Sequence, residues 1–454
     1  MTQQVEKREK YDQYLADFET FKKSANGHTW LNEIRTTGLS TFNATGFPTA
    51  TRGNEEWRFT NVGPIARKAF TYPFKVSADS VTKEQLKAIA PWDDKWTTLV
   101  FVDGRFDENL SSPAIQKNGV TVSNLDAALD SEKGLIEQHL GRYVESDKNG
   151  FTAVNTAFLR DGALVKIADN TEDTPPVHLL FVSSERSEPF VAYPRSLVVV
   201  GKNSKATLME SYISLTENGY FTDGVAEIVL QDGAQVDHFR LMREAAQAYH
   251  ITTTQVHQSK DSTFNSTSFA RGSSIARNQI HVALDGPGAA CTLKGLYLTD
   301  GSEHIDNNIN IDHLKPHTNS DLFFKGILAG KSKAVFSGRV IVHKDAQKVL
   351  ANQSDKNLIL SENARINTKP MLLIYADDVK CAHGATAGAV SDDVIFYMLS
   401  RGLDMETATR YLIQGFAHEV IDGIPLDGFR DYMDTYFVES LPAYTFQMKR
   451  PGRN

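Results

Sequence analysis

A long series of short β-rich runs occupies the middle of this chain and restricts its fold more than any other feature. The runs recur at intervals of roughly 8–14 residues, and turn-forming dipeptides such as Asp232-Gly233 and Asp300-Gly301 separate them. They comprise residues 177–182, 196–200, 206–213, 225–230, 236–241, 251–256, 279–284, 290–298, 305–311, 322–328, 335–342 and 371–375. Because no amphipathic helix of about ten or more residues interrupts the series, a sheet with crossover helices is excluded.

The remaining architectures are a sandwich, a barrel and a β-solenoid, since each is built from strands without intervening helices. No strict short repeat is visible in the runs, so the pattern alone does not choose among the three. The length of the β-rich region favours a solenoid, because a solenoid grows by adding rungs and needs no larger core.

The segments on both sides of the β-rich runs have the apolar spacing of helices. Near the N-terminus this spacing joins Tyr11, Leu15, Phe18 and Phe21, and it returns at residues 30–42 and 81–89. After Gly384 the helical period resumes, with Gly402 expected just beyond the end of one helix and Asp404 expected to cap the next. We therefore expect an N-terminal helical domain at residues 1–95, a β-rich core at 96–385 with a helical insertion near 125–145, and a C-terminal helical domain at 386–454.

Composition excludes several classes of function. The chain has 454 residues, 41% hydrophobic and 23% charged, and a net charge of −8, which argues against binding a phosphate backbone. The N-terminal residues lack the apolar stretch of a secretory signal, and no run approaches the ~18 apolar residues of a membrane span. Two cysteines cannot form a disulfide framework. We therefore expect a soluble cytoplasmic protein that binds neither nucleic acid nor membranes.

The segment from Ala376 to Thr386 places Cys381 two residues before His383, after an apolar run. On a β-strand this spacing puts thiol and imidazole on the same face. Sulfur and nitrogen donors suit iron, zinc or a nascent iron–sulfur unit, but two ligands do not complete a metal site. The alternative is that Cys381 is a small buried hydrophobic residue beside an ordinary polar histidine. Spacing alone leaves both interpretations open.

Other patterns lack the requirements of the motifs they resemble. Residues 326–332 have three residues between two glycines, where a phosphate-binding loop needs four and a following helix, so we expect a turn. His304, His313 and His317 lack a diagnostic metal-ligand spacing and are expected at the surface. Cys291 lies in a β-rich run and is expected in the core. We therefore expect no catalytic residues, no ATP bound by this chain and no enzymatic activity.

The stretch around Cys381, read with its flanks, resembles the SufB/SufD family of iron–sulfur cluster assembly proteins. The resemblance rests on residues 54–60, 155–162, 193–195, 336–342, 351–360, 370–386, 396–402 and 415–416, which together span nearly the whole chain. The form of residues 380–386 and the Glu55-Glu56-Trp57 segment resemble the SufD branch. The cysteine-bearing central motif of the SufB branch is not apparent, and Ala382 stands where serine is frequent in the SufD branch.

The resemblance implies a mainly β fold, with a right-handed parallel β-helix between N-terminal and C-terminal helical domains. It implies a scaffold subunit that pairs edge to edge with SufB, binds the ABC-type ATPase SufC through its C-terminal helices, and supports cluster assembly and iron acquisition. It further implies one SufB and two SufC subunits per copy of this chain. Reduced flavin (FAD) is associated with such assemblies, and the resemblance leaves open whether the chain forms a homodimer without SufB.

The same resemblance assigns candidate site residues. His383 and Cys381 are expected to face SufB, where a transient iron–sulfur cluster forms and partner ligands complete the metal site. Residues expected to contribute to SufC binding are Arg401, Gly402, Tyr411 and Phe416. Two alternatives stay open: a SufB-like paralogue that accepts sulfur, and a β-solenoid enzyme acting on polysaccharides, for which Asp306, Asp312 and Asp321 would be the candidate carboxylates.

Overall fold

The computed structural model describes residues 12–25, 28–48, 54–74, 81–144 and 149–441; the predicted helical position Tyr11 and the C-terminal tail lie outside them. The helices are α2 Asp12–Ser24, α3 Thr29–Thr45, the 3-10 helix η1 Glu55–Trp57, α4 Gly63–Arg67, α5 Lys83–Ile89, α6 Leu125–Ser131, α7 Lys133–His139, α8 Gly150–Ala157, α9 Asp392–Ser400, α10 Met405–Ile421 and α11 Asp427–Ser440. The early strands are β1 Thr97–Val102, β2 Arg105–Phe106, β3 Ile115–Lys117, β4 Val120–Asn124, β5 Ala163–Ile167, β6 Val177–Ser183, β7 Val191–Ala192 and β8 Arg195–Val200. The later strands are β9 Lys205–Ser214, β10 Phe221–Leu230, β11 Gln235–Arg243, β12 Tyr249–Gln258, β13 Thr263–Arg271, β14 Ile275–Leu284, β15 Ala290–Thr299, β16 His304–His313, β17 Asn319–Leu328, β18 Lys333–Val342, β19 Val349–Ile359, β20 Arg365–Ile374 and β21 Val379–Gly388.

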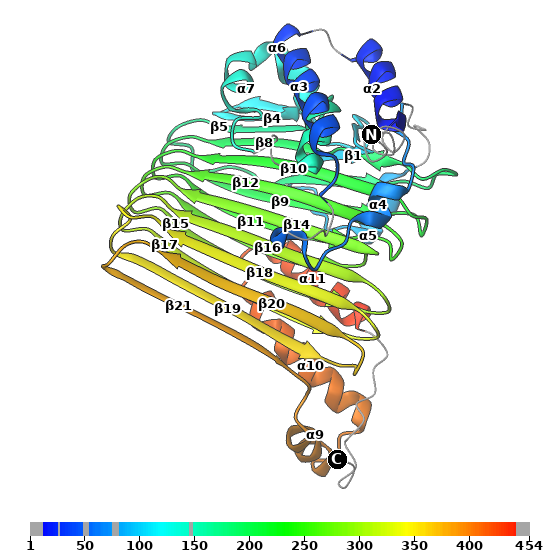
Figure 1. Cartoon of the computed structure of the whole chain (residues 1–454), viewed down its shortest axis with the longest axis vertical. Coiled ribbons are helices and arrows are strands. Elements are labelled where there is room, and N and C mark those ends of the chain that lie inside the picture. The colour runs from blue at the N-terminus through cyan, green and yellow to red at the C-terminus, as the bar shows by residue number, and fades with distance from the viewer. Residues whose placement is uncertain (1–11, 26–27, 49–53, 75–80, 145–148, 442–454) are drawn as a thin grey trace, which may run out of the picture.

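Two sheets face each other along the molecule (Figure 1). The first sheet has the order β2-β1-β6-β9-β11-β13-β15-β17-β19-β21, and the second has the order β20-β18-β16-β14-β12-β10-β8-β5-β4-β3. From β8 onward, successive long strands alternate between the sheets, and neighbours within each sheet are parallel. Each turn of the chain thus adds one strand to each sheet, which confirms the mainly β solenoid fold.

Apolar side chains stack in rows inside the solenoid. In the first sheet one inward row runs through Val236, Phe264 and Cys291, which occupy matching register positions on consecutive strands. The predicted turns separate the strands, and Gly233 and Gly301 adopt positive φ angles of 69° and 55° there. Cys291 is buried in this row, so its predicted place in the core is confirmed.

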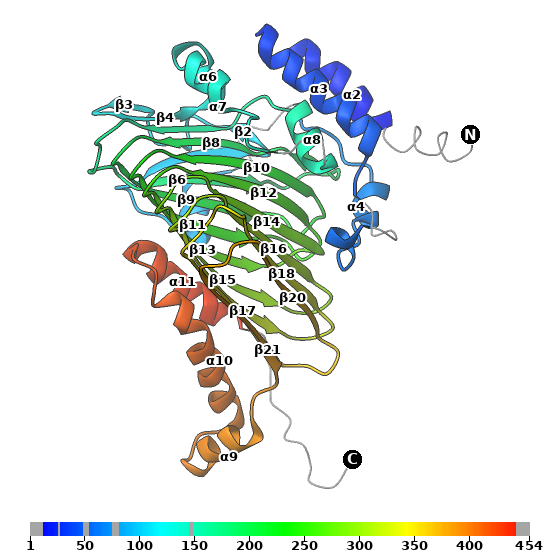
Figure 2. The same cartoon turned by 60° about the vertical axis from the view of Figure 1, so that its left-hand side comes forward.

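Helices cover one end of the solenoid and one of its faces. An aromatic cluster joins α2, α3 and α8 to the start of the second sheet, where Phe151 contacts Phe221. On the other side, α10 and α11 pack against the outer face of the first sheet (Figure 2), where Phe239 lies 5.4 Å from Phe429 between ring centroids. The buried ammonium of Lys325 donates to the carbonyl of Phe416 and pairs with Glu419. No described helix is both long and apolar enough to cross a membrane.

Helix boundaries largely follow the sequence signals, whereas three of the long strands and most of the short early ones were not predicted. Gly402 has a φ of 91° just beyond α9, and the Asp404 side chain accepts a hydrogen bond from the Thr407 N–H at the start of α10. The expected insertion near 125–145 is the short pair α6 and α7. Among the long strands from β9 onward, β13, β19 and β21 were not predicted, and the shorter strands β2, β3, β4, β5 and β7 also lie outside the predicted runs. The β-rich region therefore continues past Tyr375, where the apolar runs end.

Candidate functional site

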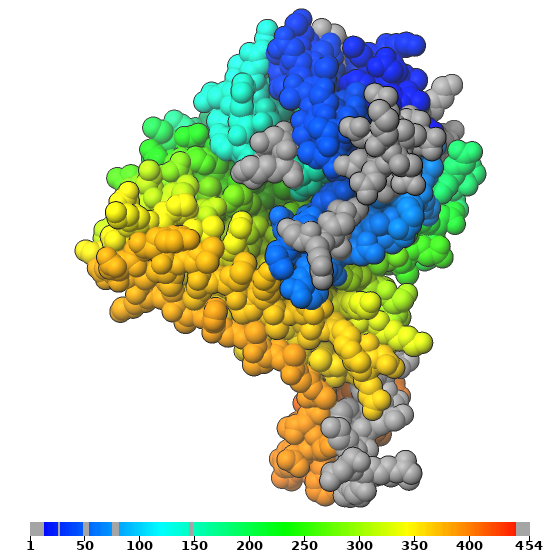
Figure 3. Space-filling view, in the orientation of Figure 1, coloured from blue at the N-terminus to red at the C-terminus, as the bar shows by residue number. Residues whose placement is uncertain are grey.

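The solenoid ends in two strands that each lack a neighbour on one side. Within the described part of the chain, β21 pairs only with β19 in the first sheet, and β20 pairs only with β18 in the second. Each has ten residues, so a long row of backbone N–H and C=O groups is left without a strand partner. Figure 3 shows these orange strands as a border that the blue N-terminal region does not cover on the visible face. We call β20 and β21 the open end.

Apolar side chains of the open end remain exposed because no further rung covers them. Ile374 continues the inward row of Leu372 on β20 yet is 41% exposed, and the adjacent Tyr375 is 63% exposed. Leu373 is also exposed. Natural sheet edges of this length are normally covered or paired, since exposed edges with apolar groups associate with other chains.

Cys381 and His383 lie on β21 and share its inward face. The structure places them not at the end of the apolar run 371–375, which belongs to β20, but on the next strand in the opposite sheet. Cys381 extends the interior row of Ala351 and is partly buried against it, whereas His383 sits opposite Gln353 and is exposed. A strand added beyond β21 would therefore lie about 5 Å from both side chains.

The two side chains supply donors for a metal without completing a site. Partial burial raises the pKa of the Cys381 thiol, and a backbone hydrogen bond with Ala351 opposes that shift. The thiol must therefore lose a proton to bind a metal, and its affinity for metals rises with pH. The described residues contain no set of three or more His, Cys, Asp or Glu side chains placed to hold a metal ion. Further ligands would have to come from outside this set.

Polar groups line the interior behind the open end, and the apolar runs of the sequence gave no signal for them. The buried Gln353 amide donates to the carbonyls of Gly338 and Met371, which tie β19 to the second sheet. Next to it along β19, Asp355 is buried, and burial raises the pKa of its carboxyl to about 6. The Asn357 amide donates to Asp355 and so links this row. The strand that supports His383 is therefore held by hydrogen bonds as well as by apolar packing.

The two cysteines differ in accessibility, which predicts selective alkylation of the native chain. Iodoacetamide is expected to modify Cys381 and leave Cys291 intact, because burial raises the pKa of Cys291 far above its usual range and shields its thiol. The rate at Cys381 is expected to rise about tenfold per pH unit up to its raised pKa, since only the thiolate reacts. Peptide mass spectrometry across pH 6–9 measures both rates, and Cys381→Ser is the control. Equal labelling of the two cysteines would contradict this arrangement.

Large apolar side chains are also exposed on the C-terminal helices. They are Val394, Phe396 and Tyr397 on α9 and Tyr411 on α10, and Phe396 is 66% exposed. We call these four residues the α9–α10 patch. Helix α9 projects beyond the open end in both orientations (Figures 1 and 2). An exposed group of large apolar side chains on a helix pair is typical of a protein-binding surface.

The four residues predicted to bind the ATPase occupy different positions relative to this patch. Tyr411 belongs to it, and the Arg401 guanidinium lies 5.2 Å from the ring centroid of Tyr397. Gly402 forms the turn between α9 and α10. Phe416 instead lies on the side of α10 that faces the solenoid, where the Lys325 ammonium is 4.2 Å from its ring centroid. The last contact gives Phe416 a role in attaching α10 to the solenoid.

The glycine-containing segment 326–332 and the histidines singled out in the sequence have structural roles. Residues 326–328 end strand β17 and residues 329–332 form the turn to β18, with no helix after it, so the segment lacks the geometry of a phosphate-binding loop. The expectation that His313 lies at the surface is wrong: it is buried between the hydroxyls of Thr318 and Ser320, and burial lowers its pKa to about 4. His304 contacts Thr60 and does not converge with His313.

The three aspartates proposed for polysaccharide chemistry do not converge. Asp306 and Asp312 lie six residues apart on β16, about 20 Å along a strand, and Asp321 lies on the other sheet. Asp306 is buried in an ion pair with Arg277, and Asp312 pairs with His281. Glycoside hydrolysis needs two carboxyls about 5–9.5 Å apart.

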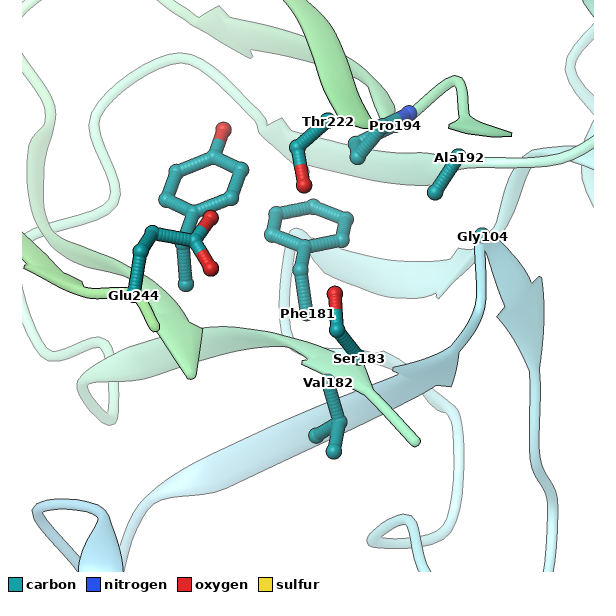
Figure 4. A pocket seen from close by; sticks show the side chains of 9 residues that line it. Gly104, Phe181, Val182, Ser183, Ala192, Pro194, Thr222 and Glu244 are labelled. Atoms are coloured by element: carbon teal, nitrogen blue, oxygen red, sulfur yellow. The ribbon is translucent and has the colours of Figure 1, made fainter. Parts of the chain in front are cut away.

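A small interior cavity near the start of the solenoid is lined by Gly104, Phe181, Val182, Ser183, Ala192, Pro194, Tyr212, Thr222 and Glu244 (Figure 4). Its volume of about 10 Å³ accommodates at most one water molecule. The cavity is therefore too small for a sugar or a nucleotide.

The chain matches two protein-family models and is similar along most of its length to several known proteins. Residues 181–416 match the family model of the SufBD core domain of the SUF system for FeS cluster assembly, and residues 6–179 match that of the SufBD N-terminal region. An iron–sulfur cluster assembly SufBD family protein of Synechocystis is 34% identical, with 82% of this chain and 83% of the relative aligned. The chloroplastic protein ABCI7 of Arabidopsis thaliana is 30% identical over 88% and 84% of the two chains. The iron–sulfur cluster assembly protein SufD of Escherichia coli is 27% identical over 95% and 96%.

Proposed function

Because this chain belongs to the SufBD family of iron–sulfur cluster assembly proteins, we propose that it is the SufD-type scaffold subunit of a SUF assembly complex. In this proposal it pairs with SufB through the open end and binds SufC through the α9–α10 patch. The observation that carries the proposal is the position of Cys381 and His383 at an unpaired sheet edge. There a partner strand could supply the missing ligands of a nascent cluster.

The chemistry of the open end fits a scaffold better than an enzyme. The exposed imidazole of His383 offers nitrogen to iron, and Cys381 offers sulfur once its proton has left. The iron–sulfur cluster is cargo in this scheme, held between two subunits and then passed on. We propose that these steps, including iron acquisition, take place in the cytoplasm, a reducing compartment that suits a chain with two unpaired cysteines.

The alternatives receive less support from the geometry. A sulfur acceptor of the SufB type needs an accessible thiol in the middle of the chain, whereas Cys291 is buried in the core. A polysaccharide enzyme needs converging carboxyls, and Asp306, Asp312 and Asp321 are far apart.

The direct test is reconstitution of the complex. This chain is mixed with SufB and SufC under anaerobic conditions, and the mass of the product is measured by sedimentation and native mass spectrometry. We expect a single species with one copy of this chain, one SufB and two SufC, in place of a homodimer of this chain. Failure to bind either partner at micromolar concentrations would reject the proposal.

The α9–α10 patch gives a prediction specific to the ATPase. The double substitution Phe396→Ser and Tyr397→Ser is expected to weaken SufC binding at least about tenfold, because aromatic side chains supply a large share of interface energy. SufB pairing should be unchanged, since neither residue lies on β20 or β21. Surface plasmon resonance with each partner separately measures both effects. A matched control is Val438→Ser on α11, which is exposed but lies outside the patch. Equal SufC affinity of wild type and double variant would exclude this surface.

A further inference from the structure

The segment of residues 54–60 crosses the outer face of the second sheet and reaches its edge strand. We call this segment the strap. Its 3-10 helix η1 buries Trp57, whose ring packs against Phe151 with 5.4 Å between centroids. The guanidinium of Arg277, on β14, lies 3.9 Å from the centroid of the Trp57 ring. The strap therefore connects the N-terminal helical region to the outer face of the second sheet.

One side of the strap is anchored by buried polar contacts. Arg277 is almost fully buried, pairs with Asp306 of β16 and lies 3.1 Å from the carboxylate of Glu56. The Thr60 hydroxyl donates to Asp306 at 2.5 Å, and the Gln279 amide donates to Glu56 at 3.1 Å. A buried cation with several charge-assisted hydrogen bonds fixes its partners in place. The strap is thus held rigidly over β14 and β16.

The opposite side of the strap faces outward and starts at the edge strand. Lys369 of β20 lies 3.4 Å from Glu55, and Glu55 lies 3.4 Å from Arg58. The Arg58 guanidinium is in turn 5.3 Å from the ring centroid of Phe59. Glu55 and Arg58 are largely exposed, and Phe59 is 41% exposed. This line of contacts continues the open end onto the outer face of the molecule.

We infer that the outward side of the strap, made of Glu55, Arg58 and Phe59, is a second part of the surface that receives the partner solenoid. The inference rests on the proposed pairing through the open end. A strand that extends the second sheet beyond β20 would lie about 5 Å from Lys369, so its outer side chains would reach the strap. The partner would present an apolar side chain to Phe59 and a carboxylate to Arg58, since Arg and aromatic side chains are the commonest anchors of interfaces.

The contacts of the strap also connect the N-terminal region with the open end. Trp57 and Thr60, which flank Arg58 and Phe59 in the sequence, are buried and in contact with the second sheet, so the backbone that carries Arg58 and Phe59 is positioned before a partner binds. Side chains that are ordered beforehand lose less entropy on binding. The strap therefore serves as a preorganised contact.

The test measures the affinity of purified SufB for single-site variants of the full chain by isothermal titration calorimetry. Phe59→Ser and Arg58→Ser are each expected to raise the dissociation constant about tenfold, and Val438→Ser, an exposed apolar position on α11 outside both proposed surfaces, should leave it unchanged. Hydrogen exchange of residues 54–60 should slow on SufB binding in the wild-type chain. Circular dichroism and thermal melting compare the folding of the variants.

The outcomes separate the inference from the function on which it rests. If wild-type chain does not bind SufB, the proposed pairing fails and the inference falls with it. If wild type binds but Phe59→Ser and Arg58→Ser bind equally well, or the strap shows no change in exchange, the inference is overturned and the pairing stands. If a variant does not fold, exchange of the wild-type strap decides the question alone.

Discussion

His383→Ala is expected to enter the complex with SufB and SufC normally, yet to leave that complex with at least about fivefold less iron and sulfide. The substitution removes the exposed nitrogen donor of the open end, and loss of one ligand from an incompletely coordinated metal strongly lowers its retention. Pairing should persist because His383 is one of many residues along β21 and its ring is not packed in the core. Anaerobic purification followed by iron and acid-labile sulfide analysis measures the content directly.

The control for this experiment lies on the same strand. Lys380 alternates with Cys381 along β21 and so faces away from the interior. Lys380→Ala should retain the full iron and sulfide content, and Cys381→Ala should show whether the thiol contributes as well. If His383→Ala forms the complex and keeps its full iron and sulfide content, His383 is not a ligand of the cluster. Loss of the whole complex would instead assign His383 to the interface.

The solenoid was predictable where its inward rows are apolar. The runs 279–284 and 335–342 fall within β14 and β18 because inward positions such as Ile280, Val282 and Val340 recur with a period of two. The glycines and aspartates between the runs form turns, because glycine adopts positive φ angles without steric cost and the aspartate side chain bonds to nearby backbone groups. The alternating apolar positions and the turn-forming residues are local patterns of a few residues each, so they can be recognised from the sequence without knowledge of the fold.

The missed long strands β13, β19 and β21 do not have a regular row of apolar residues on their inward side. On β13 the inward Ser266 bonds His238, and on β19 the inward row contains Gln353, Asp355 and Asn357. Strand β21 is largely exposed and carries mainly small residues after His383. A period-two search for apolar residues finds none of these strands, since the buried polar side chains of β13 and β19 are satisfied by hydrogen bonds and β21 has no continuous apolar row.

The sequence predicted the two residues of the candidate site, Cys381 and His383, but not their position on the last strand of a sheet. The spacing of Cys381 and His383 indicated a shared strand face, and β21 has that geometry. That the strand is the last of its sheet depends on where the chain stops adding rungs, and no local signal marks this point. The strap likewise depends on contacts between Glu56 and Arg277, more than two hundred residues apart, which only the fold brings together.

Arg195→Met is expected to lower the free energy of unfolding by about 3–5 kcal/mol, because it leaves a carboxylate buried without its cation. The Arg195 guanidinium and the Glu227 carboxylate are both fully buried and 2.5 Å apart. Glu227 also accepts the backbone N–H groups of Gly141 and Tyr143, and Arg195 contacts the Asn155 amide of α8. The pair therefore joins the helical insertion and α8 to the start of the solenoid.

A double-mutant cycle separates the ion pair from general packing. Arg195→Met combined with Glu227→Gln should recover a substantial part of the loss, since the uncompensated charge is gone. Lys133→Met is the control, because its pair with Glu137 is exposed at 3.8 Å and should contribute less than about 1 kcal/mol. The midpoint of urea unfolding, followed by fluorescence and circular dichroism together, measures each variant. If the double variant is no more stable than Arg195→Met alone, the buried charge is not the cause. The loss of stability would then come from the packing around Asn155, whose side-chain amide donates hydrogen bonds to the carbonyls of Pro194 and Asp223. Asn155 would be the next position to test.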